Sequence, residues 1–243
     1  MRLFGLIGNP LTHSFSKKYF TEKFEKEEIT ECQYELFPLK TIDELPSLFR
    51  THPNLEGLNV TVPYKKQVLK FLDEVHLPEG LEACNCINQT GSKLVGYNTD
   101  VTGFEVSIKS LLKSHHKKAL VLGQGGAAAA IVFVLKKLGI GFTIVSRTVH
   151  GVSTLTYKKV TEDVISKHSI IINATPLGMH PAEESCPDIP YQFVSDKHLF
   201  YDLVYNPAKT LFLKKGEERG AAIKNGEEML KLQAEESWRI WNN

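Results

Sequence analysis

The chain has 243 residues, of which 42% are hydrophobic, and its 29 basic and 28 acidic side chains give a formal net charge of +1. This length and hydrophobic content allow one large domain or two medium-sized ones. The balanced charge predicts neither a nucleic-acid surface nor a membrane-binding surface, and no apolar run approaches the roughly 18 residues of a membrane span.

The four cysteines do not form a metal-binding pattern. Cys84 and Cys86 are separated by one residue, whereas zinc knuckles have about two to four between paired cysteines, and no second pair follows. We therefore expect no metal site. The first residues lack the apolar stretch of a signal peptide, so we expect a cytoplasmic protein with reduced thiols.

The first half of the chain alternates short apolar runs with amphipathic segments, which predicts strands and helices. Strands are predicted at 3–7, 33–37, 57–60, 86–88 and 94–97, and helices at 17–25, 42–49, 64–72 and 102–113. The polar run at 114–118 is the expected break between two domains.

The second half alternates strands and helices regularly, which is typical of a parallel sheet with right-handed crossovers. Strands are predicted at 119–122, 142–145, 170–172 and 200–204, and helices from the glycine run to about 138, at 160–167 and at 227–241. The segment 148–169 is short for a crossover with a full helix. Either a complete helix is missing from one face of this sheet, or the segment is a compact loop without functional meaning.

The run Gly123-Gln-Gly-Gly-Ala-Ala-Ala-Ala130 follows an apolar strand, and its Gly123, Gly125 and Ala128 fit G-x-G-x-x-[G/A]. The first small residue allows a tight turn, the second lets the backbone approach a pyrophosphate, and the third lets the helix pack on the strand. The helix N-terminus then presents its N–H groups to the phosphates. The context predicts a dinucleotide site; the alternative is a glycine turn selected for packing.

The next strand ends at Ser146-Arg147-Thr148 without an acidic residue. At this position an acidic residue binds the free 2′-hydroxyl of NAD, whereas a basic one accepts the 2′-phosphate of NADP. Arg147 lies 24 positions after Gly123 and offers a planar, permanent cation. We therefore favour NADP; the alternative is a solvated arginine and a cofactor site indifferent to the phosphate.

Polar clusters follow other predicted strands, where α/β proteins place ligand sites. Asn59-Val-Thr-Val-Pro-Tyr-Lys65 places a lysine just past a strand end, and Asp100 stands at a loop-to-helix junction, where a helix N-cap is the simpler interpretation. In the second half, Asn173-Ala-Thr-Pro-Leu-Gly-Met179 and Asp202-Leu-Val-Tyr-Asn-Pro207 also follow strands.

Together these motifs resemble the shikimate dehydrogenase family, in family order and over nearly the whole chain. The matching segments are Ser14-Phe-Ser16, Asn59–Lys65, Gly96–Asp100, Gly123–Ala127, Ser146–Thr148, Asn173–Gly178, Asp202–Pro207 and Gln233-Ala234. The resemblance implies an α/β fold: a mixed α/β substrate-binding and catalytic domain at 1–101, a Rossmann-like NADP-binding domain at 102–226, and a C-terminal helix at 227–243 that returns to the first domain. The implied activity is the reversible, NADPH-dependent reduction of 3-dehydroshikimate to shikimate in aromatic amino-acid biosynthesis.

The resemblance also implies roles for individual residues. Lys65 would be the main acid/base and Asp100 its partner, and which of the two moves the proton stays open. The substrate-binding residues would be Ser14 and Ser16 for the carboxylate, Asn59, Thr61, Asn85, Asp100 and Gln233 for the ring hydroxyls, and Tyr205 near the substrate. The cofactor-binding residues would be Gly123, Gly125, Gly126, Ala127, Ser146, Arg147, Thr148, Asn173, Ala174, Thr175, Leu203, Gly226 and Met229.

Two positions depart from the family pattern. The family usually has asparagine at Ser146 and often a second basic residue after the arginine, but here His150-Gly151 follows, so we expect a weaker clamp on the 2′-phosphate. The family also usually has glycine before Met229, where this chain has Glu228. This glutamate either perturbs the nicotinamide or points outward at a helix start, where the dipole favours it.

Two alternatives remain at this stage. A quinate/shikimate dehydrogenase that uses NAD is the first, although Ser16 favours shikimate and Arg147 favours NADP. A non-catalytic NADP-binding regulator on the same scaffold is the second, and the presence of both Lys65 and Asp100 argues against it. The expected partner is a small-molecule substrate, without nucleic acid or membrane, and the chain would be a monomer or a homodimer.

Overall fold

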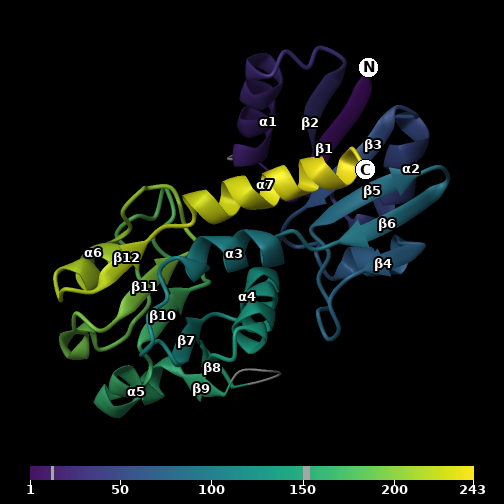
Figure 1. Ribbon diagram of the computed structural model, residues 1–243. Helices are drawn as coiled ribbons and strands as arrows, with labels where there is room; N and C mark the ends of the chain where they lie inside the picture. Colours follow the sequence, from purple (N-terminus) through teal and green to yellow (C-terminus); the bar gives the residue numbers. More distant parts are fainter. Residues whose placement is uncertain (12–13, 150–153) are drawn as a thin grey trace. The chain divides into compact units, whose positions relative to one another are not determined.

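The computed structural model describes residues 1–11, 14–149 and 154–243, which divide into two compact units (Figure 1). The first unit comprises Met1–Thr99 with Ala234–Asn243, and the second comprises Asp100–Gln233. The C-terminal helix α7 (Glu227–Trp241) therefore supplies residues to both units. Asp100 and the first part of α7, which the sequence placed with the substrate domain, belong to the second unit.

A six-stranded sheet of order β2-β1-β3-β5-β6-β4 forms the centre of the first unit. Its strands are β1 (Arg2–Gly8), β2 (Cys32–Pro38), β3 (Leu55–Val60), β4 (Glu74–His76), β5 (Cys86–Thr90) and β6 (Lys93–Tyr97). The sheet is mixed, because β1 pairs in parallel with β2 and β3 whereas β5 is antiparallel to both β3 and β6. This confirms the mixed α/β class expected for this half, although the short strand β4 was not predicted.

The helices of the first unit are α1 (Phe15–Lys26), the 3-10 helix η1 (Ile42–Glu44), α2 (Leu45–Thr51) and the 3-10 helix η2 (Gln67–Phe71). The helix predicted at 64–72 is only this 3-10 helix after a run of turns. The carbonyl of Lys65 accepts a hydrogen bond from the Cys84 N–H at 2.8 Å, so this carbonyl is paired with a distant segment and not within a helix. Tertiary pairing thus prevails over the local helical pattern.

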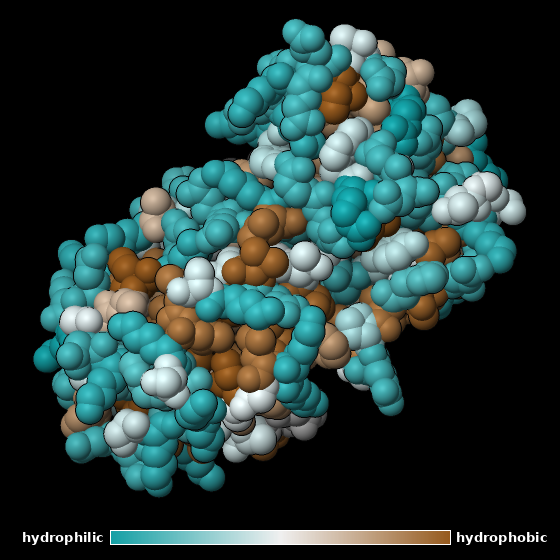
Figure 2. Space-filling view, viewed as in Figure 1, coloured by the Kyte–Doolittle hydropathy of each residue, from teal (hydrophilic) through white to brown (hydrophobic). Residues whose placement is uncertain are grey.

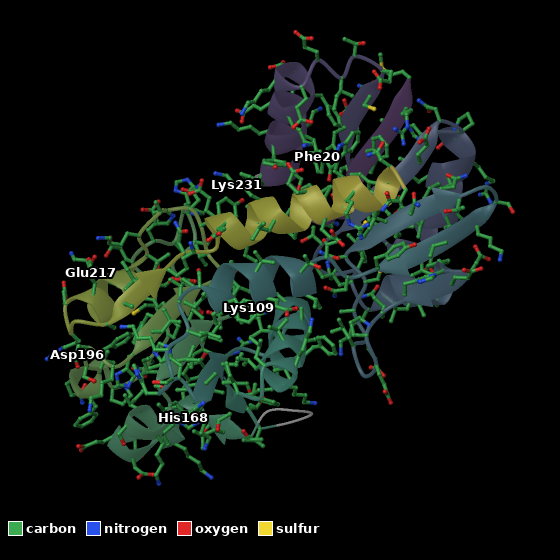
Figure 3. The ribbon with its side chains drawn as sticks, in the orientation of Figure 1. Phe20, Lys109, His168, Asp196, Glu217 and Lys231 are labelled. Atoms are coloured by element: carbon green, nitrogen blue, oxygen red, sulfur yellow. The ribbon has the colours of Figure 1, made fainter. Side chains whose placement is uncertain are left out.

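An aromatic cluster holds the last turns of α7 within the first unit. The Trp241 ring stacks on Phe4 with centroids 4.8 Å apart, and its Nε1 donates to the Ile87 carbonyl at 2.9 Å. Phe20 of α1 packs against the same ring, beside the carboxyl half of α7 (Figure 3). A Cβ atom on Gly57 would lie 2.3 Å from Trp241 Nε1, so β3 needs glycine at this contact.

The second unit contains a six-stranded parallel sheet of order β12-β11-β10-β7-β8-β9, as predicted from the strand–helix alternation. Its strands are β7 (Lys118–Leu122), β8 (Gly141–Ser146), β9 (Leu155–Thr156), β10 (Ile170–Asn173), β11 (Leu199–Asp202) and β12 (Ala222–Lys224). Its other helices are α3 (Asp100–Lys109), α4 (Gly126–Lys137), η3 (Tyr157–Lys159), α5 (Glu162–Lys167), η4 (Tyr191–Phe193) and α6 (Leu211–Glu217).

In its described residues, the crossover from β8 to β10 contains β9, η3 and the six-residue helix α5, and no longer helix. His168, which follows α5, is buried between the Val164 carbonyl, 2.6 Å from its Nδ1, and the Thr143 hydroxyl, 2.8 Å from its Nε2 (Figure 3). Burial lowers the pKa of His168, so the neutral ring ties this short crossover to β8.

The visible surface is mostly hydrophilic, and apolar side chains gather over the region of α3 and α4 (Figure 2). These two helices lie side by side in the second unit, and Val106 of α3 is a large apolar side chain that stays exposed. Among the described residues, no helix combines the length and the apolar character needed to cross a membrane.

Replacing Trp241 with alanine should lower the free energy of unfolding by about 3–5 kcal/mol, because the change leaves a cavity and an unpaired Ile87 carbonyl. Urea denaturation followed by circular dichroism measures the effect. Arg239→Ala is the matched control on the same helix, since Arg239 is exposed and pairs with Glu236 of the same helix. The control should change the free energy by less than about 1 kcal/mol. An equally small effect of Trp241→Ala would contradict the assigned anchoring role.

Candidate active site

The carboxyl ends of β1 and β3 bring several predicted substrate residues to one edge of the first sheet. The Thr61 N–H donates to the Ile7 carbonyl at 2.9 Å, which holds the segment after β3 against β1. The bond from the Cys84 N–H to the Lys65 carbonyl places the Lys65 backbone beside Asn85, the residue that follows Cys84. Lys65 itself is half-buried. These backbone contacts therefore hold the segments that carry Thr61, Lys65 and Asn85 at the edge where α/β sheets bind ligands.

The predicted substrate residue Asn59 is the centre of a buried hydrogen-bonded group. The Tyr34 hydroxyl donates to Asn59 Oδ1 at 2.8 Å. Asn59 Nδ2 donates to Ser237 Oγ at 2.8 Å and to the Asn85 carbonyl at 3.4 Å. The Ser237 and Thr99 hydroxyls lie 3.3 Å apart. Every member of this group is less than a tenth exposed.

Asn85 is joined to the same group through Thr99. Asn85 Oδ1 accepts from the Thr99 N–H at 2.6 Å, and Asn85 Nδ2 donates to the Thr99 hydroxyl at 3.0 Å. Sequence reasoning named Asn59 and Asn85 but missed Tyr34, Thr99 and Ser237. Two signals could have indicated these residues. Thr99 lies within the Gly96–Asp100 motif, and Ser237 lies four residues after Gln233, one helical turn further along α7.

Ser14 carries a buried polar atom for which the described residues supply no partner. Its hydroxyl is buried, and it has no hydrogen-bond partner among the described residues. Ser14 is the N-cap residue of α1, whose first turn contains no acidic side chain and no side-chain cap. A buried hydroxyl without a partner is costly, and a helix N-terminus favours an anion, so both features fit a carboxylate ligand. Ser16 lies in the same first turn and hydrogen-bonds Tyr34.

Three predicted site residues belong to the second unit. Asp100 is buried and is the first residue of α3, directly after Thr99 in the chain. The Gln233 side chain is buried, and its Nε2 donates to the Leu230 carbonyl at 2.9 Å. Tyr205 is half-buried, and burial raises the pKa of its hydroxyl.

The glycine run forms the turn between β7 and α4 that its pattern predicts. Gly123 has a φ of +107°, and a Cβ there would lie 3.0 Å from Thr175 Cγ2. Gly125 is the N-cap of α4, and a Cβ on it would meet no atom within 4 Å, so its backbone faces open space. The first turn of α4, which includes Gly126 and Ala127, contains no acidic side chain. The turn therefore fits a dinucleotide pyrophosphate.

The end of β8 presents one arginine to solvent. Arg147 is exposed, and its charge opposes the rise that burial causes in the pKa of the Tyr157 hydroxyl. Ser146 is buried, and its hydroxyl donates to the Thr148 carbonyl, which fixes this bend. Arg147 is therefore available for a phosphate, whereas His150-Gly151 lies outside the described residues.

Asn173 at the end of β10 is fully buried, although its position after a strand had indicated a cofactor contact. Its Nδ2 donates to Asp202 Oδ1 at 2.9 Å. Its Oδ1 accepts from the Thr175 N–H at 3.0 Å and from the Thr175 hydroxyl at 2.6 Å. The side chain therefore shapes the loop that carries Ala174 and Thr175 from within the fold.

Asp202, the last residue of β11, is also fully buried. It accepts hydrogen bonds from the Val204 N–H at 3.0 Å and from the Thr210 hydroxyl at 2.5 Å. Burial raises its pKa to about 6, and the hydrogen bonds from Thr210, Val204 and Asn173 act in the opposite direction. Since Thr210 can also accept, the protonated acid keeps a partner on each oxygen.

The remaining cofactor residues lie around the loop after β11. The Leu203 N–H donates to the Asn173 carbonyl at 3.0 Å, and a Cβ on Gly226 would lie 2.2 Å from the Leu203 carbonyl oxygen. Met229 is buried in the first turn of α7. Glu228 is exposed and ion-paired with Lys224, which agrees with the outward orientation considered above.

The cysteines and the other metal-ligating side chains form no metal site in the part of the chain that the structure describes. There, no group of three or more His, Cys, Asp or Glu side chains is placed to hold a metal ion. Cys86 is fully buried, and burial raises the pKa of its thiol. A buried, protonated thiol is a poor metal ligand and a poor nucleophile.

Comparison with known proteins gives a consistent match. Residues 6–87 match the family described as shikimate dehydrogenase substrate binding domain. A shikimate dehydrogenase (NADP(+)) of Carboxydothermus hydrogenoformans is 35% identical over 99% of this chain and 91% of its own length. Shikimate dehydrogenase from Aquifex aeolicus has a TM-score of 0.87 at 31% identity, covering 100% of this chain and 92% of that one. Shikimate 5-dehydrogenase from Thermus thermophilus, in complex with NADP(H) and shikimate, has a TM-score of 0.86 at 28% identity, covering 99% and 93%.

The raised pKa of the buried Asp202 carboxyl group predicts an unusual dependence of stability on pH. Because the folded-state pKa of Asp202 is raised to about 6, its contribution to stability is present in full below about pH 4 and is lost as the pH rises through 6. In Asp202→Asn the side chain is neutral throughout. The free energy of unfolding of wild type minus that of the variant should therefore fall by about 2 kcal/mol between pH 4 and pH 7.

Urea denaturation at a series of pH values measures this difference and cancels the titrations that both proteins share. Asp188→Asn, which removes an exposed carboxylate of the same unit, is the control. A difference between wild type and Asp202→Asn that grows with pH would show that Asp202 is stabilised as the carboxylate.

Proposed function

The chain belongs to the shikimate dehydrogenase family, and we propose that it catalyses the reversible, NADPH-dependent reduction of 3-dehydroshikimate to shikimate. Nearly full-length similarity to enzymes named shikimate dehydrogenase (NADP(+)) supports this activity. The structural observation that carries the proposal is the Ser14 hydroxyl at the N-terminus of α1, which is buried, lacks a hydrogen-bond partner within the described ranges and lies in the same unit as Lys65. It fits a substrate that bears a carboxylate.

We propose that the first unit holds the substrate through complementary polar groups. Ser14, Ser16 and the N-terminus of α1 bind the carboxylate, where the helix dipole favours negative charge. Asn59, Thr61 and Asn85, at the strand ends, bind ring hydroxyls, together with Gln233 and with Tyr205 near the substrate. Carboxamides and hydroxyls suit this task because each can accept and donate hydrogen bonds.

We propose that Lys65 performs the proton chemistry. Reduction of the ketone develops negative charge on its oxygen, and the Lys65 ammonium stabilises this charge and delivers a proton to the oxygen. Asp100 orients the lysine and binds a substrate hydroxyl. When bound, the nicotinamide supplies the hydride. Half-burial of Lys65 strengthens its attraction for the developing charge because less water screens it.

We propose that the second unit holds NADP through the α4 turn and Arg147. The open space at Gly125 and the N-terminus of α4 accommodate the pyrophosphate, and the exposed guanidinium of Arg147 accepts the 2′-phosphate. The loops shaped by Asn173 and Asp202 line the nicotinamide side, with Ala174, Thr175 and Leu203. Ser146 and Thr148 hold the bend that carries Arg147.

We further propose that the protein acts on small molecules in the cytoplasm. None of the four cysteines, all of which the structure describes, forms a disulfide bond, as a reducing compartment favours.

Lys65→Ala should lower kcat by roughly 10²- to 10⁴-fold, the range typical of a lost general acid or base, with little change in NADP affinity. Shikimate-dependent reduction of NADP⁺, followed by absorbance, measures kcat. Lys66→Ala is the matched control, because Lys66 is the exposed neighbour in the same turn. Near-normal turnover of Lys65→Ala would refute the mechanism, and NADP binding by a wild-type protein without any turnover would favour a regulator.

Arg147→Ala should raise KM for NADP⁺ by roughly 10- to 100-fold and leave KM for NAD⁺ nearly unchanged, because a charge-assisted bond to the 2′-phosphate is lost. Initial rates with both cofactors and with shikimate or quinate give these constants. Arg219→Ala, which removes another exposed arginine of the second unit, is the control. Equal rises in KM for both cofactors would contradict the proposed role of Arg147 in binding the 2′-phosphate. A wild-type protein that prefers quinate and NAD⁺ would instead be a quinate dehydrogenase, and the proposed activity would be wrong.

A further inference from the structure

We propose that Ser237 and Tyr34 are positioning residues that fix the orientation of the Asn59 carboxamide for substrate binding. This inference rests on the proposed function, since it concerns how a ring hydroxyl is recognised. Neither residue is in the set of substrate-binding residues named above. Both act through Asn59, one from the edge strand β2 and one from the C-terminal helix α7.

The orientation of Asn59 follows from the groups around it. The Asn85 backbone carbonyl can only accept, so the nitrogen of the Asn59 carboxamide has to face it, at 3.4 Å. Ser237 Oγ accepts the second Nδ2 proton at 2.8 Å. Asn59 Oδ1 therefore faces Tyr34, whose hydroxyl donates to it at 2.8 Å. Both Nδ2 protons are used, and in the part of the chain that the structure describes Oδ1 accepts from Tyr34 alone, which leaves one lone pair for a hydroxyl that donates.

The orientation of the Asn85 carboxamide is also set by a neighbouring backbone group, and this carboxamide is linked to that of Asn59. The Thr99 backbone N–H can only donate, so Asn85 Oδ1 has to face it, at 2.6 Å. The Thr99 hydroxyl lies 3.0 Å from Asn85 Nδ2 and 3.3 Å from Ser237 Oγ. Ser237 therefore lies between the two carboxamides, and its loss removes the side-chain link from Asn59 to Thr99.

The positions of Tyr34 and Ser237 are themselves rigid. Ser237 is fully buried, and the turn that follows it is anchored by the bond from Trp241 to the Ile87 carbonyl. Tyr34 stacks on Phe20 with centroids 4.5 Å apart, and burial raises the pKa of its hydroxyl well above the ordinary value. Tyr34 therefore stays a neutral donor, and a preorganised carboxamide gives up less freedom when substrate binds.

The second unit contains a matched control for this serine–tyrosine pair. Ser107 Oγ and the Tyr201 hydroxyl lie 2.6 Å apart, and both residues are fully buried. Neither residue contacts a carboxamide named in the candidate active site among the hydrogen bonds described. Removal of either oxygen leaves a comparable buried defect, so these variants report what loss of stability alone does to the kinetics.

The experiment compares Ser237→Ala, Tyr34→Phe and the double variant with Ser107→Ala and Tyr201→Phe in the full-length protein. Each site variant should raise KM for shikimate roughly 5- to 50-fold, as expected for one misplaced buried hydrogen-bonding group, and leave KM for NADP⁺ within about twofold. The double variant should raise KM by less than the product of the two single effects, because both act on one carboxamide. The control variants should lower the thermal midpoint but leave KM for shikimate within about twofold.

The outcomes separate this inference from the proposed function. A wild-type protein that does not reduce NADP⁺ with shikimate overturns the proposed function and this inference with it. An active wild type whose Ser237→Ala and Tyr34→Phe variants keep a normal KM for shikimate overturns the positioning role alone. Tyr34→Phe removes a single oxygen and preserves the ring packing, so it decides the question if Ser237→Ala does not fold. Equal rises in KM for both substrates would show a merely structural defect.

Discussion

The contact between Trp241 and β3 is the constraint on which the first unit depends. The indole lies where a Cβ of residue 57 would be, only 2.3 Å from its Nε1, and bonds the Ile87 carbonyl. This glycine allows the last turns of α7 to approach the sheet closely. The approach brings Ser237, from the far end of the chain, within 2.8 Å of the Asn59 carboxamide. A packing constraint thus sets the geometry of the proposed substrate site.

Each unit uses a buried carboxamide at a strand end to hold neighbouring segments. In the first unit Asn59 joins β2, α7 and the segment before β5, and in the second Asn173 joins the loops after β10 and β11. Buried polar groups stabilise a fold only when their hydrogen bonds are satisfied, and the observed geometry satisfies both carboxamides. Ser14 is different, because its buried hydroxyl lacks a partner among the described residues, as a ligand-binding group would.

Much of the fold could be predicted because its signals are local. The glycine turn before α4 and the strand–helix alternation of the second unit are encoded within short stretches, and both were correct. The helix expected at 64–72 was wrong because the Lys65 carbonyl pairs with Cys84, a partner that no local pattern indicates. Tyr34 and Ser237 were missed for the same reason, since the bond between Asn59 and Ser237 spans 178 positions.

The site residues named from sequence differ in how their side chains can act. Asn173 ends a strand, where ligand-binding residues often lie, yet its amide is hydrogen-bonded to Asp202 and Thr175, so its effect on a ligand passes through the loop it shapes. Asn59 is oriented instead by an acceptor-only carbonyl, so its oxygen faces Tyr34 and keeps a second lone pair among the described residues. The hydrogen-bond polarity of the site is therefore set by backbone groups before any ligand arrives. Such preorganisation favours ligands whose hydroxyl donates at that position, because a ligand group that can only accept would face the second lone pair of Asn59 Oδ1 and form no hydrogen bond with it.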